Sequence, residues 1–362
     1  MSKSAKYLLI GSTEAYSGKS ATVLGVAHQL TEKGLDIAYG KPLGTFWSGS
    51  PNQAIEADVQ FVAQTLNLPK NRLQPTILPL TDTTIQKRIR GEDQTDYCQL
   101  LAECLQLEGP DLVVLEGPAN LEEGSLFDLS LLQVADIVDA SVLLVARFHT
   151  LLIVGALLSA KRRLGDRLLG VFINDIPKER LEEVRTTVKP FLEKHGIPIF
   201  GLMPRNALLR SVSVSDLAEQ LSAEVLCRAD RLDLMVESLS IGAMNVNSAL
   251  KYFRKGHNMA VITGGDRTDI QLAALETSTQ CLILTGQMRP HPDVLRRAED
   301  LEIPILSVDL DTLTAVEIVD RAIGQVRIHE PMKIQCLYQM MSEHFDFDRL
   351  LADLNLHPVV TA

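Results

Sequence analysis

A Gly-Lys-Ser tripeptide at residues 18–20 separates a short apolar segment, Tyr7–Ile10, from a stretch with helical spacing that runs from Gly18 to Lys33. Backbone N–H groups at the start of a helix, together with the positive end of the helix dipole, bind phosphate groups. A strand that leads through a loop into a helix is also the first step of an open α/β sheet. This feature therefore predicts both a parallel-sheet fold and a phosphate site.

The residues of this loop are those that a nucleoside triphosphate site needs. Lys19 would reach the β- and γ-phosphates, Ser20 would hold Mg²⁺ through its hydroxyl, and Gly18 lets the backbone approach the phosphates. The usual pattern is G-x-x-x-x-G-K-[ST], and its first glycine falls on Thr13, two places after Gly11. The alternative is an ordinary Gly-Lys-Ser at a helix start, but the order of strand, loop and helix favours the nucleotide site. The predicted cofactor-binding residues of the loop are Thr13, Glu14, Ser17, Gly18, Lys19, Ser20 and Ala21.

Short apolar runs alternate with helical patterns through the first 200 residues. Because these runs are apolar almost without interruption, they are typical of parallel strands that are buried on both faces. Helical spacing recurs from about Thr150 to Leu164. The alternation predicts a doubly wound parallel sheet. With the Gly-Lys-Ser loop after its first strand, the fold expected is a doubly wound sheet of the P-loop NTPase type. The predicted strands are Tyr7–Ile10, Asp36–Tyr39, Leu112–Leu115, Val142–Val145, Leu168–Ile173 and Ile197–Phe200.

The pattern changes near Met203-Pro204, and we expect domains at residues 1–204 and 205–328, followed by a helical tail at 329–362. A mainly helical stretch is predicted up to about Met244, and closely spaced strands and helices then predict a second, smaller α/β domain. The tail would serve as a cover or as an oligomer contact. The predicted strands of the second domain are Ala260–Thr263, Cys281–Leu284 and Ile305–Val308, and its helices are Asp269–Leu275, Pro292–Asp300 and Thr312–Ile323.

Composition excludes several classes of function. The chain has 362 residues and a net charge of -11, which disfavours nucleic acid and anionic membranes because both attract clustered Lys and Arg. The apolar start, Tyr7–Ile10, is too short for a signal peptide, and no apolar run approaches the roughly 20 residues that span a bilayer. The five cysteines form no C-x-x-C pair, so neither a zinc site nor a disulfide framework is indicated. We expect a cytoplasmic protein with no nucleic-acid or membrane partner.

The loop and two later segments resemble the dethiobiotin synthetase-like branch of P-loop proteins. Lys41-Pro42 follows the second predicted strand, and Glu116-Gly117 ends the third. The resemblance implies that Lys41 contacts phosphate and substrate and that Glu116 binds the metal. The alternatives are an exposed lysine before a turn and a plain strand-terminal acid. The resemblance thus implies Lys19, Lys41 and Glu116 as catalytic residues and Ser20 and Glu116 as Mg²⁺ ligands.

Further segments extend this resemblance or depart from it. Asn174 ends an apolar strand, and the resemblance implies that its amide recognises the nucleobase, although Asn also commonly starts a turn. Pro204 lies in a Gly-x-x-Pro segment that the resemblance places near the base. The run Pro118–Gly124 departs from the glycine-rich run of the synthetases, so no substrate residue is assigned there. Asp58 is a further acid for the metal, with a solvated helix face as the favoured alternative.

The string Gly264-Gly265-Asp266-Arg267-Thr268 is the most distinctive of the second predicted domain. Its glycines allow positive φ and close approach of a ligand, Arg267 can hold an anion, and Asp269 is predicted to cap the next helix. The string resembles the DRTGG domain in rearranged form. A ligand site or interface at Gly264, Gly265, Asp266 and Arg267 stands beside a simpler alternative, a tight turn whose arginine pairs with a local acid.

The order of the two domains resembles the N-terminal part of long phosphate acetyltransferases. In that family a large catalytic domain follows the DRTGG domain, whereas here the sequence continues only for the segment 329–362. We therefore expect that this chain does not transfer acetyl groups by itself.

Three functions remain open. The first is a regulatory or sensory protein that binds ATP or ADP with Mg²⁺ and passes its state to a protein partner or a second small ligand through the DRTGG domain. The second is an ATP-dependent ligase of the dethiobiotin synthetase type, and the third is a slow P-loop ATPase switch. The domain order favours the regulatory function. A homo-oligomer is also expected, because the DRTGG domain and the helical tail offer association surfaces.

Overall fold

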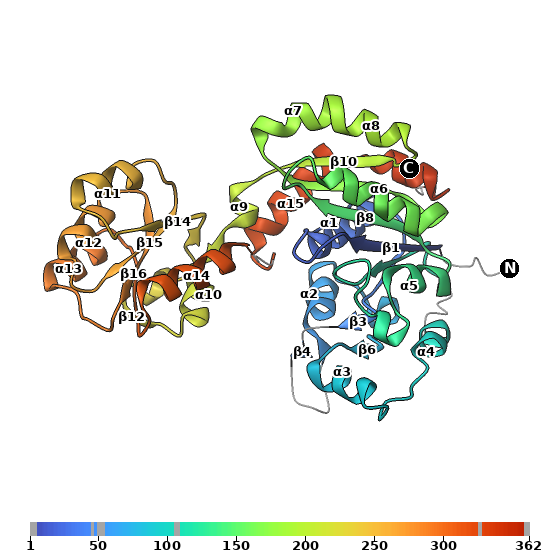
Figure 1. Cartoon of the computed structure of the whole chain (residues 1–362), viewed down its shortest axis with the longest axis horizontal. Coiled ribbons are helices and arrows are strands. Elements are labelled where there is room, and N and C mark those ends of the chain that lie inside the picture. Colours follow the sequence, from blue (N-terminus) through green and yellow to red (C-terminus); the bar gives the residue numbers. More distant parts are fainter. Residues whose placement is uncertain (1–5, 45–46, 49–54, 105–108, 325–327, 358–362) are drawn as a thin grey trace. The chain divides into compact units, whose positions relative to one another are not determined.

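The computed structural model describes residues 6–44, 47–48, 55–104, 109–324 and 328–357. The chain divides into two compact units, the first made of residues 1–205 and 329–362 and the second of residues 206–328 (Figure 1). The first unit is thus assembled from two segments that are distant in the sequence. Among the described residues, no helix is long and apolar enough to cross a bilayer.

The first unit is built around a six-stranded parallel sheet in the order β10-β9-β8-β1-β7-β2. Because β1 lies inside the sheet, later strands are added on both of its sides, which confirms the predicted doubly wound arrangement. Ile197 precedes the last strand, which instead continues as far as Pro204. The strands are β1 (Lys6–Ser12), β2 (Ile37–Gly40), β7 (Leu112–Glu116), β8 (Ser141–Arg147), β9 (Leu168–Ile176) and β10 (Ile199–Pro204).

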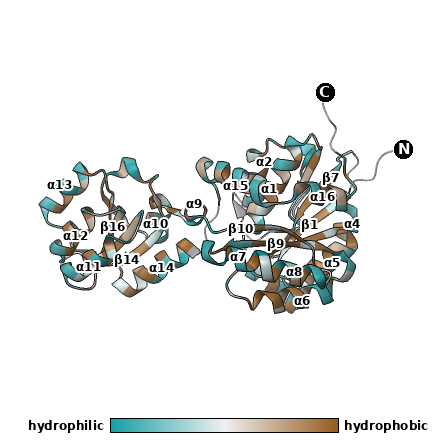
Figure 2. Cartoon of the chain, turned by 90° about the horizontal axis from the view of Figure 1, so that it is seen from above, coloured by the Kyte–Doolittle hydropathy of each residue, from teal (hydrophilic) through white to brown (hydrophobic). Residues whose placement is uncertain are grey.

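Helices cover both faces of this sheet. One face packs against α4, α5, α6 and α8, and the opposite face packs against α1 and the C-terminal helices α15 and α16. The central strands are buried and predominantly hydrophobic (Figure 2), as their continuous apolar runs predict. The helices are α1 (Lys19–Glu32), α2 (Ala57–Thr65), α3 (Asp82–Ile89), α4 (Tyr97–Cys104), α5 (Leu131–Ile137), α6 (Ile153–Leu164), α7 (Leu181–Glu183), α8 (Lys189–Lys194), α15 (Pro331–His344) and α16 (Phe347–Asp353). Two short ladders pair β3 (Leu43–Gly44) with β6 (Leu78–Pro79) and β4 (Trp47–Ser48) with β5 (Ile55–Glu56).

The C-terminal helices complete the first unit. The ring of Tyr338 in α15 stacks on His28 of α1, with ring centroids 3.5 Å apart. Phe345, just after α15, lies 5.5 Å from Phe172 of β9, again measured between ring centroids. In this structure the helical tail therefore covers one face of the parallel sheet.

The second unit holds a five-stranded sheet in the order β12-β17-β16-β15-β14, parallel except for β12. Helices α11, α12 and α13 pack on one face and α10 and α14 on the other, each around its own hydrophobic core. The strands are β12 (Glu224–Cys227), β14 (Ser238–Ile241), β15 (Met259–Gly264), β16 (Thr279–Thr285) and β17 (Ile305–Val308). The helices are α10 (Val214–Gln220), α11 (Val246–Phe253), α12 (Thr268–Leu275), α13 (Pro292–Asp300) and α14 (Thr312–Gly324). This confirms the smaller second α/β domain.

The prediction of a mainly helical stretch up to Met244 was wrong. Residues 224–241 contribute the two edge strands β12 and β14, and β11 (Val212–Ser213) pairs with β13 (Met235–Val236). The helices in this stretch are short, since α9 (Ala207–Arg210) is a single turn. Edge strands are covered less than central ones, so their apolar runs are shorter than those by which the central strands were found.

Candidate functional site

The phosphate loop leaves β1 at Ser12 and enters α1 at Lys19. The N–H of Thr13 donates to the carbonyl of Val145 at 3.1 Å, so the loop begins along the end of β8. Gly18 has a φ of +93°, and a Cβ at this position would lie 2.2 Å from Asn174 Nδ2. Both the backbone conformation and the close approach of β9 therefore require glycine here.

The start of α1 is suited to an anion. The helix has no side-chain cap and no acidic residue in its first turn, to which Ala21 also belongs. Ser17 is buried, and its hydroxyl has no hydrogen-bond partner among the described residues. Uncapped N–H groups and a buried hydroxyl both need partners, and phosphate oxygens supply them. Glu14, by contrast, bonds to the exposed His149, with 2.7 Å between its Oε1 and the ring Nε2.

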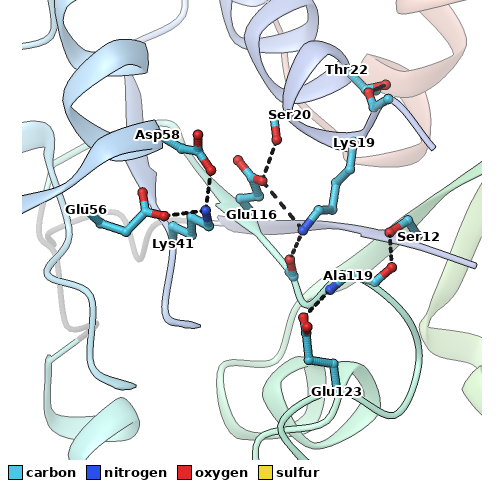
Figure 3. Close-up of polar contacts among 12 residues, drawn as sticks. Ser12, Lys19, Ser20, Thr22, Lys41, Glu56, Asp58, Glu116, Ala119 and Glu123 are labelled. Atoms are coloured by element: carbon cyan, nitrogen blue, oxygen red, sulfur yellow. Dashed lines mark hydrogen bonds and ion pairs between the residues drawn. The ribbon is translucent and has the colours of Figure 1, made fainter. Parts of the chain in front are cut away.

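Glu116, at the end of β7, is buried in the centre of the site and lies between two lysines (Figure 3). Its Oε1 accepts a hydrogen bond from the hydroxyl of Ser20 at 2.7 Å and lies 3.5 Å from Lys19 Nζ. Its Oε2 accepts a hydrogen bond from the hydroxyl of Tyr39 at 3.0 Å. Lys19 also donates to the carbonyl of Gly117. The structure thus brings Glu116 of β7 into direct contact with Lys19 and Ser20 at the start of α1.

Lys41, directly after β2, is buried and held by two carboxylates from the start of α2 (Figure 3). Its Nζ lies 2.5 Å from Glu56 Oε1 and also bonds to Asp58 Oδ2. Glu56 additionally caps α2 by accepting a hydrogen bond from the N–H of Val59 at 2.9 Å. Neither the exposed lysine nor the solvated Asp58 considered as alternatives is found, because both side chains belong to one buried ion-pair cluster.

Burial and neighbouring charges together shift the pKa values of the titratable groups in this cluster. Burial alone would lower the pKa of Lys41, but the carboxylates of Glu116, Asp58 and Glu56 together raise it above the ordinary lysine value. Burial is the main cause that lowers the pKa of Lys19; the charge of Glu116 opposes this shift, and the charge of Lys41 adds to it. Burial, followed by the charge of Glu116, raises the pKa of the Tyr39 hydroxyl. Lys41 is thus held firmly as a cation, whereas Lys19 is the less strongly stabilised of the two.

The donor set near Lys19 fits a magnesium ion that is bound mainly by phosphate and water. Mg²⁺ usually takes only one or two protein oxygens beside substrate phosphates. Ser20 and Glu116 would supply these ligands, since their oxygens already lie 2.7 Å apart. Among the described residues, no group of three or more His, Cys, Asp or Glu side chains could hold a metal without such a ligand.

Asn174 and Pro204 lie at the same edge of the sheet, at the ends of β9 and β10. The amide of Asn174 donates from Nδ2 to the carbonyl of Ser17 at 2.9 Å, so this side chain contacts the phosphate loop. Pro204 is the last residue of β10, one strand farther from the loop. The structure therefore connects Asn174 to the loop and leaves Pro204 beyond it.

In the second unit, the Gly-Gly-Asp-Arg string forms the turn between β15 and α12. Gly264 ends β15, and a Cβ on Gly265 would lie 2.5 Å from the carbonyl oxygen of Met288. Arg267 donates to the carbonyl of Met244 at 3.0 Å and pairs with Asp269 at 3.3 Å. The prediction that Asp269 caps the helix was wrong, because α12 begins at Thr268 and Asp269 lies inside its first turn. Asp266 folds back, with its Oδ1 2.5 Å from the place of a Cβ on Gly264.

Sequence reasoning missed several contacts of the first site. Tyr39 bonds to Glu116, and Glu56 and Asp58 bond to Lys41. The position of Tyr39 offered one signal, because it lies two residues before Lys41 and therefore near the same strand end. Glu56 offered none, since it follows a separate segment and reaches Lys41 only through the fold. Asp58 was considered as a further acid for the metal but not as a partner of Lys41.

The parallel sheet, the phosphate loop and the contacts of Lys19 and Ser20 define a P-loop protein. Residues 6–213 match the family described as an AAA domain, and this match spans more than half of the chain. Residues 216–322 match the DRTGG domain. The chain therefore belongs to this AAA domain family and carries a DRTGG domain after it, which confirms the combination that the sequence resembles.

Several phosphate acetyltransferases are similar to this chain. That of Synechocystis sp. is 25% identical over 311 residues, which cover 81% of this chain and 44% of that enzyme. That of Nitratidesulfovibrio vulgaris is 24% identical over 370 residues, which cover 95% of this chain and 51% of that enzyme. The chain thus spans about half the length of these curated relatives.

A solved structure of the CBS and DRTGG domains from the regulatory region of Clostridium perfringens pyrophosphatase, complexed with its activator diadenosine tetraphosphate, also matches. It is 19% identical and covers 43% of this chain and 74% of that chain, with a TM-score of 0.29. A likeness this distant carries no argument about the ligands of the present chain.

Proposed function

We propose that this chain is a nucleotide-binding regulatory or sensory protein whose first unit binds ATP or ADP with Mg²⁺ at the phosphate loop. The observation that carries the proposal is the start of α1, where an uncapped helix end adjoins the buried hydroxyl of Ser17, which has no partner within the described part of the chain. The match of residues 6–213 to an AAA domain family supports it further. On binding, Lys19 would exchange its contact with Glu116 for the phosphates.

Charge balance supports the magnesium ion in this proposal. The two lysines of the site, Lys19 and Lys41, stand against the three carboxylates of Glu56, Asp58 and Glu116, which leaves negative charge in excess. A nucleotide phosphate chain adds more negative charge to the same place. A divalent cation between Ser20, Glu116 and the phosphates offsets this repulsion. We therefore expect nucleotide to bind more weakly without Mg²⁺.

Calorimetric titration of the full chain with ATP, ADP and GTP, with and without Mg²⁺, tests the proposal. Adenine nucleotides with Mg²⁺ should bind saturably, and Lys19→Ala should weaken that binding by about tenfold to a hundredfold, since a charged hydrogen bond contributes about 1.5–3 kcal/mol. Lys33→Ala is the matched control, because Lys33 follows the far end of α1 and pairs with the exposed Asp348. Unchanged affinity in a folded Lys19→Ala variant would overturn the site.

The position of Lys41 favours one second candidate, an ATP-dependent ligase of the dethiobiotin synthetase type. Lys41 lies at the carboxyl edge of the sheet, close enough to Glu116 for the charge of Glu116 to raise its pKa. A ligase would need Lys41 to leave Glu56 and Asp58 in order to reach phosphate or substrate. Phosphate release, followed in the titrated samples, distinguishes the candidates. Binding without release supports a sensor, whereas steady release supports the ligase or a slow ATPase switch.

We extend the proposal to the second unit, with the turn at Gly264–Arg267 as the place of a second small ligand or a protein partner. One observation supports this extension: Gln271 of α12 is fully buried, donates to the carbonyl of Gly264, and has no hydrogen-bond partner for its Oε1 among the described residues. A cytoplasmic location and a homo-oligomer also belong to the proposal.

A further inference from the structure

A second charged cluster lies at the carboxyl edge of the six-stranded sheet, on the other side of β1 from Lys41. Arg147 ends β8, Asp175 is the penultimate residue of β9, and Arg205 follows β10. Arg147 donates from Nε to Asp175 Oδ2 at 2.9 Å, and Arg205 donates from Nε to Asp175 Oδ1 at 2.8 Å. One carboxylate thus orients two guanidinium groups that come from the two neighbouring strands.

The outer nitrogen atoms of both arginines, the Nη atoms, are available to a ligand. Within the part of the chain that the structure describes, the Nη atoms of Arg147 and Arg205 make no hydrogen bond. Their side chains are 18% and 41% exposed, so a ligand can reach them. Two guanidinium groups against one carboxylate leave a positive charge in excess, which is the opposite of the balance around Lys41. A planar guanidinium with free Nη groups matches the oxygens of a phosphate.

The arginine cluster is connected to the phosphate loop by short contacts. Asn174, the residue before Asp175, donates to the carbonyl of Ser17 in the loop. Thr13 of the loop bonds to Val145, and Arg147 lies two residues beyond it, about 7 Å farther along the strand. The strand of Asp175 is the second from β1, about 10 Å across the sheet. A nucleotide held by the loop can extend along this edge toward either cluster, and only the arginine cluster carries an excess of positive charge.

We propose that Arg147 and Arg205 form a second phosphate-binding position, and that the ligand is a nucleoside polyphosphate that carries a further phosphate on its ribose. This inference rests on the proposed nucleotide site at the loop, which holds the 5′ phosphates. Asp175 is the positioning residue of the pair, because it contacts both Nε atoms and would not touch the ligand. The Nη atoms of the two arginines donate to the ribose phosphate.

Calorimetry on the full chain with Mg²⁺ tests this with three probes: ADP, ADP with a 3′-phosphate and ADP with a 2′-phosphate. We expect one of the phosphorylated probes to bind at least about tenfold more tightly than ADP, as one additional charged contact predicts. The readout is the ratio of affinities, so a general loss of binding cancels. Arg205→Gln should bring this ratio close to one. Arg185→Gln, which alters an exposed arginine paired with Glu182, should leave the ratio as it is.

Each outcome of these titrations either supports or overturns the inference. Equal affinities for all three probes in the unaltered chain overturn the inference while leaving the proposed function intact. If the ratio of affinities is unchanged in both Arg205→Gln and Arg147→Gln, the inference is also overturned. The arginine cluster would then only connect the ends of neighbouring strands. Arg205 is the more exposed of the two, so its variant remains informative if Arg147→Gln fails to fold. No binding of any probe overturns the proposed function together with this inference.

Discussion

A lysine that is 4% exposed, as Lys41 is, remains a cation only because carboxylates surround it. We expect Lys41→Met to lower the free energy of unfolding by about 3–5 kcal/mol, because Glu56 and Asp58 then lose their buried partner. Urea unfolding measures this loss. Since the folded-state pKa of Lys41 is raised, its contribution is fully present below the ordinary lysine pKa and is lost only as pH rises through the raised value. The loss should therefore be constant around neutral pH.

Lys33→Met is the control for this prediction, because the pair of Lys33 with Asp348 is exposed and its removal should cost no more than about 1 kcal/mol. A second substitution, Glu56→Gln, should recover part of the loss in Lys41→Met by removing an uncompensated charge. If Lys41→Met costs no more than Lys33→Met, the buried cluster does not exist as described.

The cluster around Lys41 also shows which site residues could be predicted from the sequence and which could not. Lys19 and Ser20 were found because they begin the helix after the first strand, and Glu116 because it ends a strand. Parallel strands bring such positions to one edge of the sheet. Glu56 and Asp58 lie at the start of a helix with no periodic relation to Lys41, so only the tertiary fold joins them. The buried surroundings of Lys41 follow from that fold and not from its neighbours in the chain.

At the scale of elements, the contact between α1 and α15 means that adding a side chain at Gly25 has a different effect from adding one at Gly155. A Cβ on Gly25 of α1 would lie 2.7 Å from Met341 Cγ in α15, whereas a Cβ on Gly155 of α6 would meet nothing within 4 Å. Alanine is favoured over glycine in a helix by up to about 1 kcal/mol. We expect Gly155→Ala to raise the free energy of unfolding by part of that amount and Gly25→Ala to lower it, because Met341 is fully buried and must shift.

Thermal and urea unfolding of the two variants, side by side, check this prediction. The double variant Gly25→Ala with Met341→Ala should show that the two changes are not additive, since the shorter side chain at 341 removes the clash. Equal stabilisation by Gly25→Ala and Gly155→Ala would mean that α15 does not pack on α1 at this distance.

Buried strands were predicted from the sequence more accurately than exposed ones. The strands β1, β7, β8 and β9 each contain a continuous apolar run, and these predicted runs lie inside the observed bounds. The edge strands β12 and β14 were missed, because their residues are half-buried or exposed and carry no apolar run longer than three residues. Helix α6 begins at Ile153 instead of Thr150, a boundary that periodicity alone does not define.

At the scale of the whole molecule, the first unit needs a segment that lies beyond the second unit in the sequence. The sequence predicted a helical tail but not the surface it covers, since that depends on contacts between distant residues. Leu337, Met341 and Leu350 are each no more than 3% exposed, and Phe345 is 6% exposed. Burial of such side chains contributes about 1.5–3 kcal/mol each, so four of them contribute roughly 6 kcal/mol or more. This is comparable with the total stability of a typical domain, about 5–15 kcal/mol.

We therefore expect a fragment of residues 1–205 to lack a cooperative unfolding transition, because it leaves one face of its sheet without α15 and α16. A fragment of residues 206–328 should unfold cooperatively, since helices within it cover both faces of its own sheet. Joining residues 329–362 to residue 205 through a flexible glycine-serine linker should restore the transition of the first unit. Circular dichroism during thermal unfolding measures all three proteins. If residues 1–205 unfold as cooperatively as the rejoined chain, the C-terminal helices are an addition to the first unit and not a part of its core.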